Sequence, residues 1–166
     1  MSLTSRPEAT AEDGRGLHAR ASRQGAVLIR VLFLCTGNSA RSQLAEALLR
    51  RRAAQVATAV ETASAGTEPQ GVNPLTIEVL AEAGIDAGDA VSEHLDRYIG
   101  EQWDYVVTVC DRAAESCPTF PGAAARLHWS VPDPAAVEGD REQRLAAFRT
   151  ARDDLDRRIR VLAGGP

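Results

Sequence analysis

One apolar segment, interrupted only by Arg30, constrains the fold of this chain more than any other feature. Residues 27–34 are Val-Leu-Ile-Arg-Val-Leu-Phe-Leu. A strand with one solvated face alternates apolar and polar residues, whereas a strand covered on both faces is apolar nearly throughout. Strands of the second kind are typical of parallel sheets, whose two faces are covered by helices. The segment therefore predicts a buried strand in a parallel sheet.

The rest of the chain alternates strand-like and helix-like segments. This alternation predicts an α/β fold with a mostly parallel sheet. Asn73 before Pro74 is typical of a helix start, and Gly84 of the residue that follows a helix. Besides the helix that starts at Pro74, strands are predicted over 60–65, 105–109 and 126–129, and helices over 43–59 and from Asp140 onward.

Composition separates a tail from a folded part and limits the chemistry. Residues 1–26 are polar and aperiodic, so we expect a disordered N-terminal tail before a single domain over 27–166. All 19 basic residues are arginines, which excludes lysine-based chemistry such as a Schiff base. The net charge of −4 gives no reason to expect nucleic acid or an anionic membrane as a partner.

The chain has three cysteines, Cys35, Cys110 and Cys117. An odd number in a chain of 166 residues argues against a secreted domain held together by disulfides. We therefore expect a cytoplasmic protein with reduced thiols. The spacing of Cys110 and Cys117 is not that of a zinc finger, so no metal site is expected from the cysteines.

The first cysteine opens a Cys-x5-Arg motif at the end of the buried strand. Such a loop can wrap an oxyanion with its backbone N–H groups, and the following helix adds the positive end of its dipole. The guanidinium of Arg41 suits a tetrahedral anion, and Gly37 is expected to supply unusual backbone angles. These donors are expected to lower the pKa of Cys35 and make it a nucleophile. The predicted oxyanion-binding residues are Thr36, Gly37, Asn38, Ser39, Ala40, Arg41 and Ser42.

These residues resemble a known family. Val31–Glu46 is similar to the opening of the low-molecular-weight tyrosine phosphatase fold, and more closely to the arsenate reductases built on that fold. The resemblance extends over about residues 27–160 and implies that fold, an α/β three-layer sandwich with a central, mostly parallel four-stranded sheet. It also includes the segments 64–69, 72–74, 110–117 and 128–134.

The reductase resemblance implies a three-cysteine relay. Cys35 attacks arsenate, Cys110 then attacks Cys35 and releases arsenite, and Cys117 attacks Cys110. The resulting Cys110–Cys117 disulfide is reduced by a thioredoxin-type protein. A disulfide brings Cα atoms within about 4.4–6.8 Å, so residues 110–117 must fold back as a short helix or loop.

Two further groups of residues follow from the same resemblance. Asp133, between two prolines, is expected to donate a proton to the leaving oxygen. Some reductases of this kind bind a monovalent cation, which Asn38, Glu46 and Ser64 could hold here.

Two other functions stay open. A low-molecular-weight tyrosine phosphatase would hydrolyse phosphomonoesters through a Cys35 phospho-enzyme and would need neither Cys110 nor Cys117. A non-enzymatic oxyanion sensor or phosphocarrier is the third possibility, and Arg41 argues against the phosphocarrier. The reductant itself is also open between thioredoxin and a small thiol such as mycothiol or glutathione.

Overall fold

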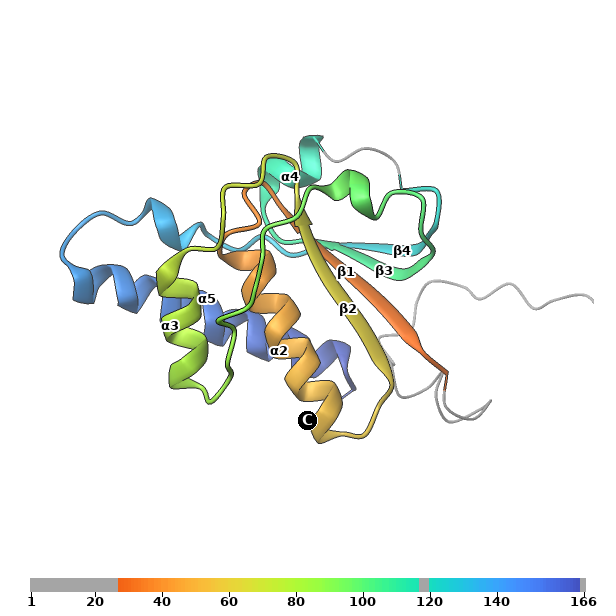
Figure 1. Ribbon diagram of the computed structural model, residues 1–166, viewed down its shortest axis with the longest axis horizontal. Coiled ribbons are helices and arrows are strands. Elements are labelled where there is room, and N and C mark those ends of the chain that lie inside the picture. Colours follow the sequence, from red (N-terminus) through yellow and green to blue (C-terminus); the bar gives the residue numbers. More distant parts are fainter. Residues whose placement is uncertain (1–26, 117–119, 165–166) are drawn as a thin grey trace, which may run out of the picture.

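The computed structural model describes residues 27–116 and 120–164, so the expected tail over 1–26 and Cys117 lie outside the described residues. A four-stranded sheet forms the centre of the described part, with helices packed against it (Figure 1). Its strands are β1 (Ile29–Cys35), β2 (Val60–Gly66), β3 (Trp103–Thr108) and β4 (Ala123–His128). The helices are α2 (Arg41–Gln55), α3 (Pro74–Glu82), α4 (Asp111–Ser116) and α5 (Arg141–Leu162), with short 3-10 turns η1 (Leu95–Arg97) and η2 (Pro134–Ala136).

All strand pairs in the sheet are parallel, in the order β2-β1-β3-β4. The sequence prediction of an α/β fold around a four-stranded parallel sheet is therefore confirmed. The register pairs Cys35 with Gly66 and Leu34 with Thr108, so the carboxyl ends of β1, β2 and β3 meet at one edge. In open parallel sheets this edge is where ligands bind.

Side chains of β1 alternate between two apolar layers. Val31 and Phe33 pack into the core shared with α2, α3 and α5, whereas Leu32 and Leu34 pack into the opposite layer. In Figure 1, α2 and α5 lie on one side of the sheet and η1 on the other. The apolar run is thus buried on both faces, as its composition predicts.

The boundaries of α2 differ from the predicted helix over 43–59. The helix begins two residues earlier, at Arg41, and ends at Gln55. Ala57 adopts the left-handed conformation, with φ 52°, and the N–H of Thr58 donates to the carbonyl of Ala53 at 3.0 Å. That arrangement ends a helix in the way a glycine usually does. Because an alanine occupies the position here, the sequence carried no stop signal.

The predicted caps of α3 and α5 are present. The side chain of Asn73 accepts a hydrogen bond from the N–H of Leu75, and Gly84 follows α3 with φ 78°. Asp140 and Gln143 form a reciprocal capping box at the start of α5. Over the described ranges, no helix is both long enough and apolar enough to cross a bilayer.

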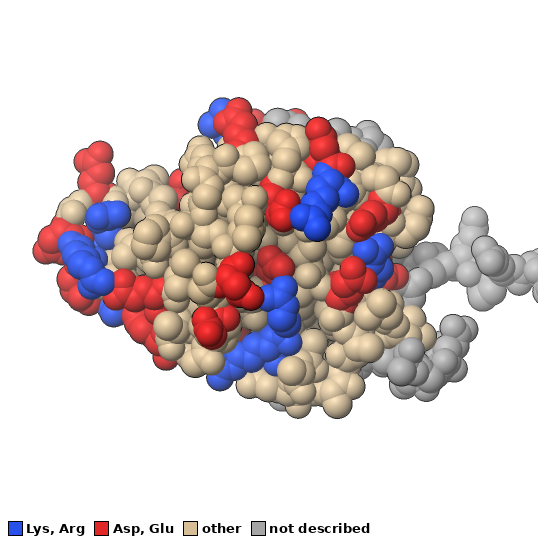
Figure 2. All heavy atoms as spheres, in the orientation of Figure 1, with Lys and Arg blue, Asp and Glu red and all other residues tan. Residues whose placement is uncertain are grey.

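Acidic and basic side chains lie interspersed over the face shown in Figure 2. Many acidic and basic side chains of the described residues form ion pairs between or along helices, such as Arg149 with Glu82 at 2.9 Å and Arg160 with Asp156 at 2.8 Å. The charged surface of the described residues therefore consists largely of neighbouring opposite charges.

Candidate anion-binding active site

The loop 35–40 connects the end of β1 to the start of α2, at the edge where the strands end. The first turn of α2 contains no acidic residue, and Ala40 at the N-cap provides no side-chain hydrogen bond. By contrast, α3 and α5 are both capped by side chains. The first N–H groups of α2 are therefore available to an anion, together with the positive end of the helix dipole.

The segment after β2 holds the loop from outside by hydrogen bonds to the backbone. Four loop carbonyl oxygens accept hydrogen bonds from backbone N–H groups of this segment. Because a carbonyl and the next N–H point in opposite directions across a trans peptide, these bonds turn the following N–H groups toward the inside of the loop. The pairs, donor first, are Thr67 with Cys35 (3.3 Å), Glu68 with Thr36 (2.9 Å), Gln70 with Gly37 (2.9 Å) and Asn73 with Ser39 (3.0 Å).

Asn38 is the buried centre of the loop. It is fully buried and adopts the left-handed conformation, with φ 45°, which asparagine tolerates better than most residues. Its amide nitrogen donates to the hydroxyls of Ser42 at 2.8 Å and Ser64 at 2.9 Å. Its amide oxygen accepts from the side chain of Gln43 at 3.0 Å and from the N–H of Glu93 at 2.8 Å. One side chain thus joins the loop, α2, β2 and the segment before η1.

Gly37 is not among the residues with a positive φ, and the left-handed position in the loop is Asn38. A Cβ on Gly37 would meet the side-chain oxygen of Gln70 at 3.2 Å, so Gly37 instead allows a close approach by that flexible side chain. Gly66 leaves less room for a side chain than Gly37 does. A Cβ there would lie 2.4 Å from the carbonyl oxygen of Thr36 and 2.9 Å from the N–H nitrogen of Asn38.

Cys35, at the start of the loop, is 3% exposed, and its sulfur has two hydrogen-bonding neighbours. The sulfur is 2.7 Å from the hydroxyl of Ser42, and it accepts a hydrogen bond from the N–H of Asn38 at 3.2 Å. Burial raises the pKa of the Cys35 thiol, and the hydrogen bonds of Ser42 and Asn38 lower it by less. The expected lowering of this pKa is therefore wrong, since the loss of water around the sulfur outweighs the donors.

Arg41, the first residue of α2, ends the loop that begins at Cys35. One of its guanidinium nitrogens donates to the carbonyl of Val131 at 2.9 Å, and another lies 3.8 Å from a carboxylate oxygen of Asp133. The other carboxylate oxygen of Asp133 accepts from the N–H of Ala135 at 3.0 Å and caps η2. These contacts connect the 130–136 loop with the predicted anion-binding residues.

Cys110 follows β3 and precedes α4, and its thiol is buried and free. Its sulfur lies 3.5 Å from the hydroxyl of Thr36, the residue after Cys35, and accepts a hydrogen bond from the N–H of Ala113 at 3.3 Å. The segment after Cys110 is helical over 111–116, which agrees with the expectation that the chain folds back there.

Four of the predicted catalytic residues line one cavity of about 620 Å³. Cys35, Arg41, Cys110 and Asp133 all line it. Asn38 and Ser42 do not line the cavity, because they lie fully buried behind the loop. The remaining loop residues that line it are Thr36, Gly37, Ser39 and Ala40.

Sequence reasoning missed a carboxylate at this cavity. Asp111 lines it, and one of its oxygens lies 2.8 Å from Nε2 of His128, whose Nδ1 is 2.8 Å from the hydroxyl of Thr108. A hydrogen bond from His128 lowers the pKa of Asp111 most, and a hydrogen bond from Ser130 lowers it further. These contacts fasten the start of α4 to the end of β4. The position of Asp111 directly after a strand-end cysteine was the available signal.

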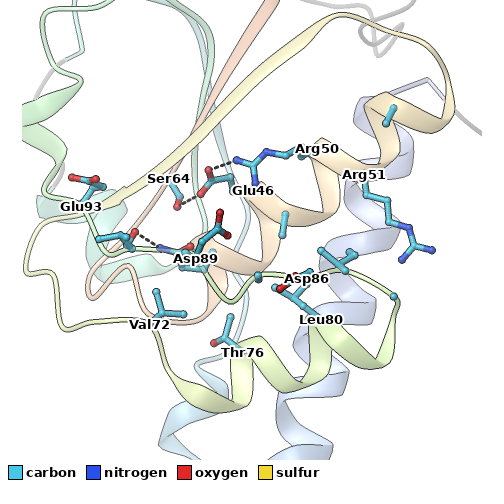
Figure 3. A pocket seen from close by; sticks show the side chains of 18 of the residues that line it. Glu46, Arg50, Arg51, Ser64, Val72, Thr76, Leu80, Asp86, Asp89 and Glu93 are labelled. Atoms are coloured by element: carbon cyan, nitrogen blue, oxygen red, sulfur yellow. Dashed lines mark hydrogen bonds and ion pairs between the residues drawn. The ribbon is translucent and has the colours of Figure 1, made fainter.

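Asn38, Glu46 and Ser64, which were expected to hold a monovalent cation, do lie together, but they bond to one another and to an arginine. Figure 3 shows the part of this cluster made by Ser64, Glu46 and Arg50. Ser64 accepts from Asn38 at 2.9 Å and donates to one oxygen of Glu46 at 2.5 Å. The other oxygen of Glu46 accepts from Arg50 at 2.6 Å. The positive charge at Glu46 is thus a guanidinium, and these residues do not fit a resident cation.

Comparison with known proteins agrees with this architecture. The family model for low molecular weight phosphotyrosine protein phosphatase matches residues 30–164. An arsenate reductase of Halalkalibacterium halodurans is 40% identical over 133 residues, which cover 80% of this chain and 94% of that protein.

Solved structures are similar over the same region. An arsenate reductase in the phosphate-binding state has a TM-score of 0.69 and 27% identity, covering 81% of this chain and 96% of that one. The YwlE arginine phosphatase from Geobacillus stearothermophilus has a TM-score of 0.63 and 27% identity, covering 81% and 90%. The chain therefore belongs to the low molecular weight phosphotyrosine protein phosphatase family, as a relative of its arsenate reductases.

Proposed function

We propose that this protein reduces arsenate to arsenite with a relay of three cysteines. The observation that carries the proposal is the second buried thiol. Cys110 lines the same cavity as Cys35, and its sulfur contacts Thr36 in the anion loop. Hydrolysis of a phosphate ester needs one thiol, whereas reduction of As(V) to As(III) needs two electrons, which a pair of thiols supplies.

The first step is the attack of Cys35 on arsenic. The loop N–H groups and Arg41 hold three arsenate oxygens, as charge-assisted hydrogen bonds favour. As the sulfur–arsenic bond forms, the Cys35 sulfur gives up its proton to an oxygen of the bound arsenate. Asp133, next to Arg41, delivers a proton to the departing oxygen. One water leaves, and the arsenate remains bound to the Cys35 sulfur.

The second step transfers the electrons. The thiolate of Cys110 attacks the Cys35 sulfur and forms a Cys35–Cys110 disulfide. The electron pair of the sulfur–arsenic bond stays with arsenic, which leaves as arsenite after protonation. Cys117 then attacks the Cys110 sulfur, so that Cys35 departs as a thiolate and a Cys110–Cys117 disulfide remains. In the sequence, Cys117 is the residue directly after Ser116, the last residue of α4.

The relay needs an external reductant. A thioredoxin-type dithiol protein fits, because it accepts a protein disulfide and returns two thiols. Such exchange requires a compartment that keeps thiols reduced, which supports a cytoplasmic location. The names of the relatives support arsenate as the substrate, and the cavity geometry supports a tetrahedral oxyanion in general.

A coupled assay separates this proposal from a phosphatase. Arsenite production is measured with thioredoxin, thioredoxin reductase and NADPH, and hydrolysis of p-nitrophenyl phosphate is measured in parallel. We expect Cys110→Ser to abolish arsenite production and to retain aryl phosphate hydrolysis, whereas Cys35→Ser abolishes both. A wild-type protein that hydrolyses the ester rapidly and forms no arsenite would make the protein a phosphatase. Sustained turnover by Cys117→Ser with thioredoxin would refute the third thiol.

A further inference from the structure

A continuous chain of hydrogen bonds connects the surface of α2 to the nucleophilic sulfur. It starts at Arg50, whose guanidinium donates to Glu46 one turn earlier on the same helix, at 2.6 Å. The other oxygen of Glu46 accepts from Ser64 on β2 at 2.5 Å. Figure 3 shows these three side chains pointing toward one another.

The inner half of the chain reaches the anion loop. Ser64 accepts from the amide of Asn38, and the same amide donates to Ser42 at 2.8 Å. The hydroxyl of Ser42 lies 2.7 Å from the Cys35 sulfur. Asn38 and Ser42 are fully buried, and Ser64 is 3% exposed, so these bonds have no competition from bulk water. The orientation of the Asn38 side chain therefore depends on the hydrogen bond between Ser64 and Glu46.

Glu46 shares a cavity with three other carboxylates and two arginines. The cavity, of about 890 Å³ between α2, α3 and the 84–93 segment, is also lined by Asp86, Asp89, Glu93 and Arg51. Arg50 lines the same cavity and bonds directly to Glu46. The side chain of Glu46 is only 19% exposed, and a carboxylate with so little water needs a partner of positive charge.

We propose that Arg50 is a positioning residue for the anion loop, and that its guanidinium supplies the positive charge which a bound monovalent cation would otherwise provide at Glu46. The paired Glu46 accepts a hydrogen bond from the Ser64 hydroxyl, and this leaves the Ser64 oxygen free to accept one from the amide of Asn38. Asn38 is then held in its left-handed conformation with its amide on Ser42. The oxyanion site of this chain is therefore complete without potassium or sodium.

Phosphate binding tests the proposal without relying on reductase turnover. Binding of inorganic phosphate to the reduced protein is measured by calorimetry in potassium chloride and in tetramethylammonium chloride of equal ionic strength. The variants are Arg50→Gln, which removes the charge, and Arg50→Lys, which keeps it. Arg160→Ala is the matched control, because it breaks a similar exposed pair, Arg160 with Asp156 at 2.8 Å, on another helix.

The wild-type protein and Arg160→Ala are expected to bind phosphate equally in both salts, within about twofold. Arg50→Gln is expected to bind about fivefold to tenfold more weakly in tetramethylammonium chloride, since a partly buried carboxylate has lost its partner. Potassium chloride restores binding to this variant, and Arg50→Lys behaves like the wild type.

Two results would overturn the proposal. The first is a wild-type protein that loses binding when potassium is withdrawn. The second is an Arg50→Gln variant that binds like the wild type in both salts. Failure of arsenate reduction leaves this test intact, because phosphate is the probe. Conversely, loss of phosphate binding in every variant and both salts would contradict the oxyanion site itself.

Discussion

Replacing Asn38 by alanine tests how far one buried side chain holds the anion loop together. The change removes four hydrogen bonds, to Ser42 and Ser64 and from Gln43 and the N–H of Glu93. Ser42 and Ser64 keep other partners, whereas the N–H of Glu93 loses its acceptor, the amide oxygen of Asn38. At about 1 kcal/mol for each bond, the loss is about 3–4 kcal/mol.

Backbone strain adds to this loss. Asn38 has φ 45°, and an alanine there costs about 1 kcal/mol more than a residue suited to the left-handed region. Asn38→Ala should therefore lower the free energy of unfolding by about 4–5 kcal/mol, a large part of the roughly 5–15 kcal/mol of a typical domain. With a denaturant slope of about 2 kcal/mol/M, the midpoint of urea unfolding should fall by about 2 M.

A glycine at the same position separates the two contributions. Asn38→Gly also lacks the four hydrogen bonds but tolerates the left-handed backbone, so it should be about 1 kcal/mol more stable than Asn38→Ala. Urea unfolding of the reduced protein, followed by circular dichroism, measures both variants. A loss below about 1 kcal/mol for Asn38→Ala, with an unchanged slope, would refute the claim that this network stabilises the fold.

Three further outcomes follow from the site. Because burial raises the pKa of Cys35, the folded protein keeps a proton that the unfolded chain releases, so the free energy of unfolding should fall as pH rises above about 8.5. Urea unfolding of Cys35→Ala should lack that part of the slope. Asp133→Asn should slow single-turnover arsenite formation by about 10²–10⁴-fold while phosphate binding, measured by calorimetry, changes little. Gly66→Ala should abolish phosphate binding, since its Cβ would lie 2.4 Å from the carbonyl of Thr36, whereas Gly100→Ala, with nothing within 4 Å, should bind normally.

The parts of the fold that depend on local patterns could be predicted from the sequence. The apolar run became β1, and the caps at Asn73 and Asp140 are where their residue types indicate. The end of α2 could not be predicted, because Ala57 adopts the left-handed conformation, which is uncommon for alanine. The start of β4 was also missed, since Ala123–Ala125 has no β-branched residue and pairs with β3 only in the folded sheet.

The site divides in the same way. Cys35 and Arg41 follow from a contiguous motif, and Cys110 follows from its place at the end of a strand. The segment after β2 holds the anion loop through its backbone N–H groups. Almost every residue type has such a group, so these hydrogen bonds could not be predicted from the sequence. The pair of Asp111 and His128 joins two strand ends distant in sequence, so only the folded sheet brings them together.

The most direct test of the thiol relay is a single turnover of the fully reduced protein with arsenate and no external reductant. Released arsenite and remaining thiols are counted, and the disulfide is located by mass spectrometry. The wild type should release one arsenite, lose two thiols and form the Cys110–Cys117 disulfide. Cys117→Ser should release one arsenite and stop with a Cys35–Cys110 disulfide. Wild-type protein that retains all three thiols and releases no arsenite would contradict the relay.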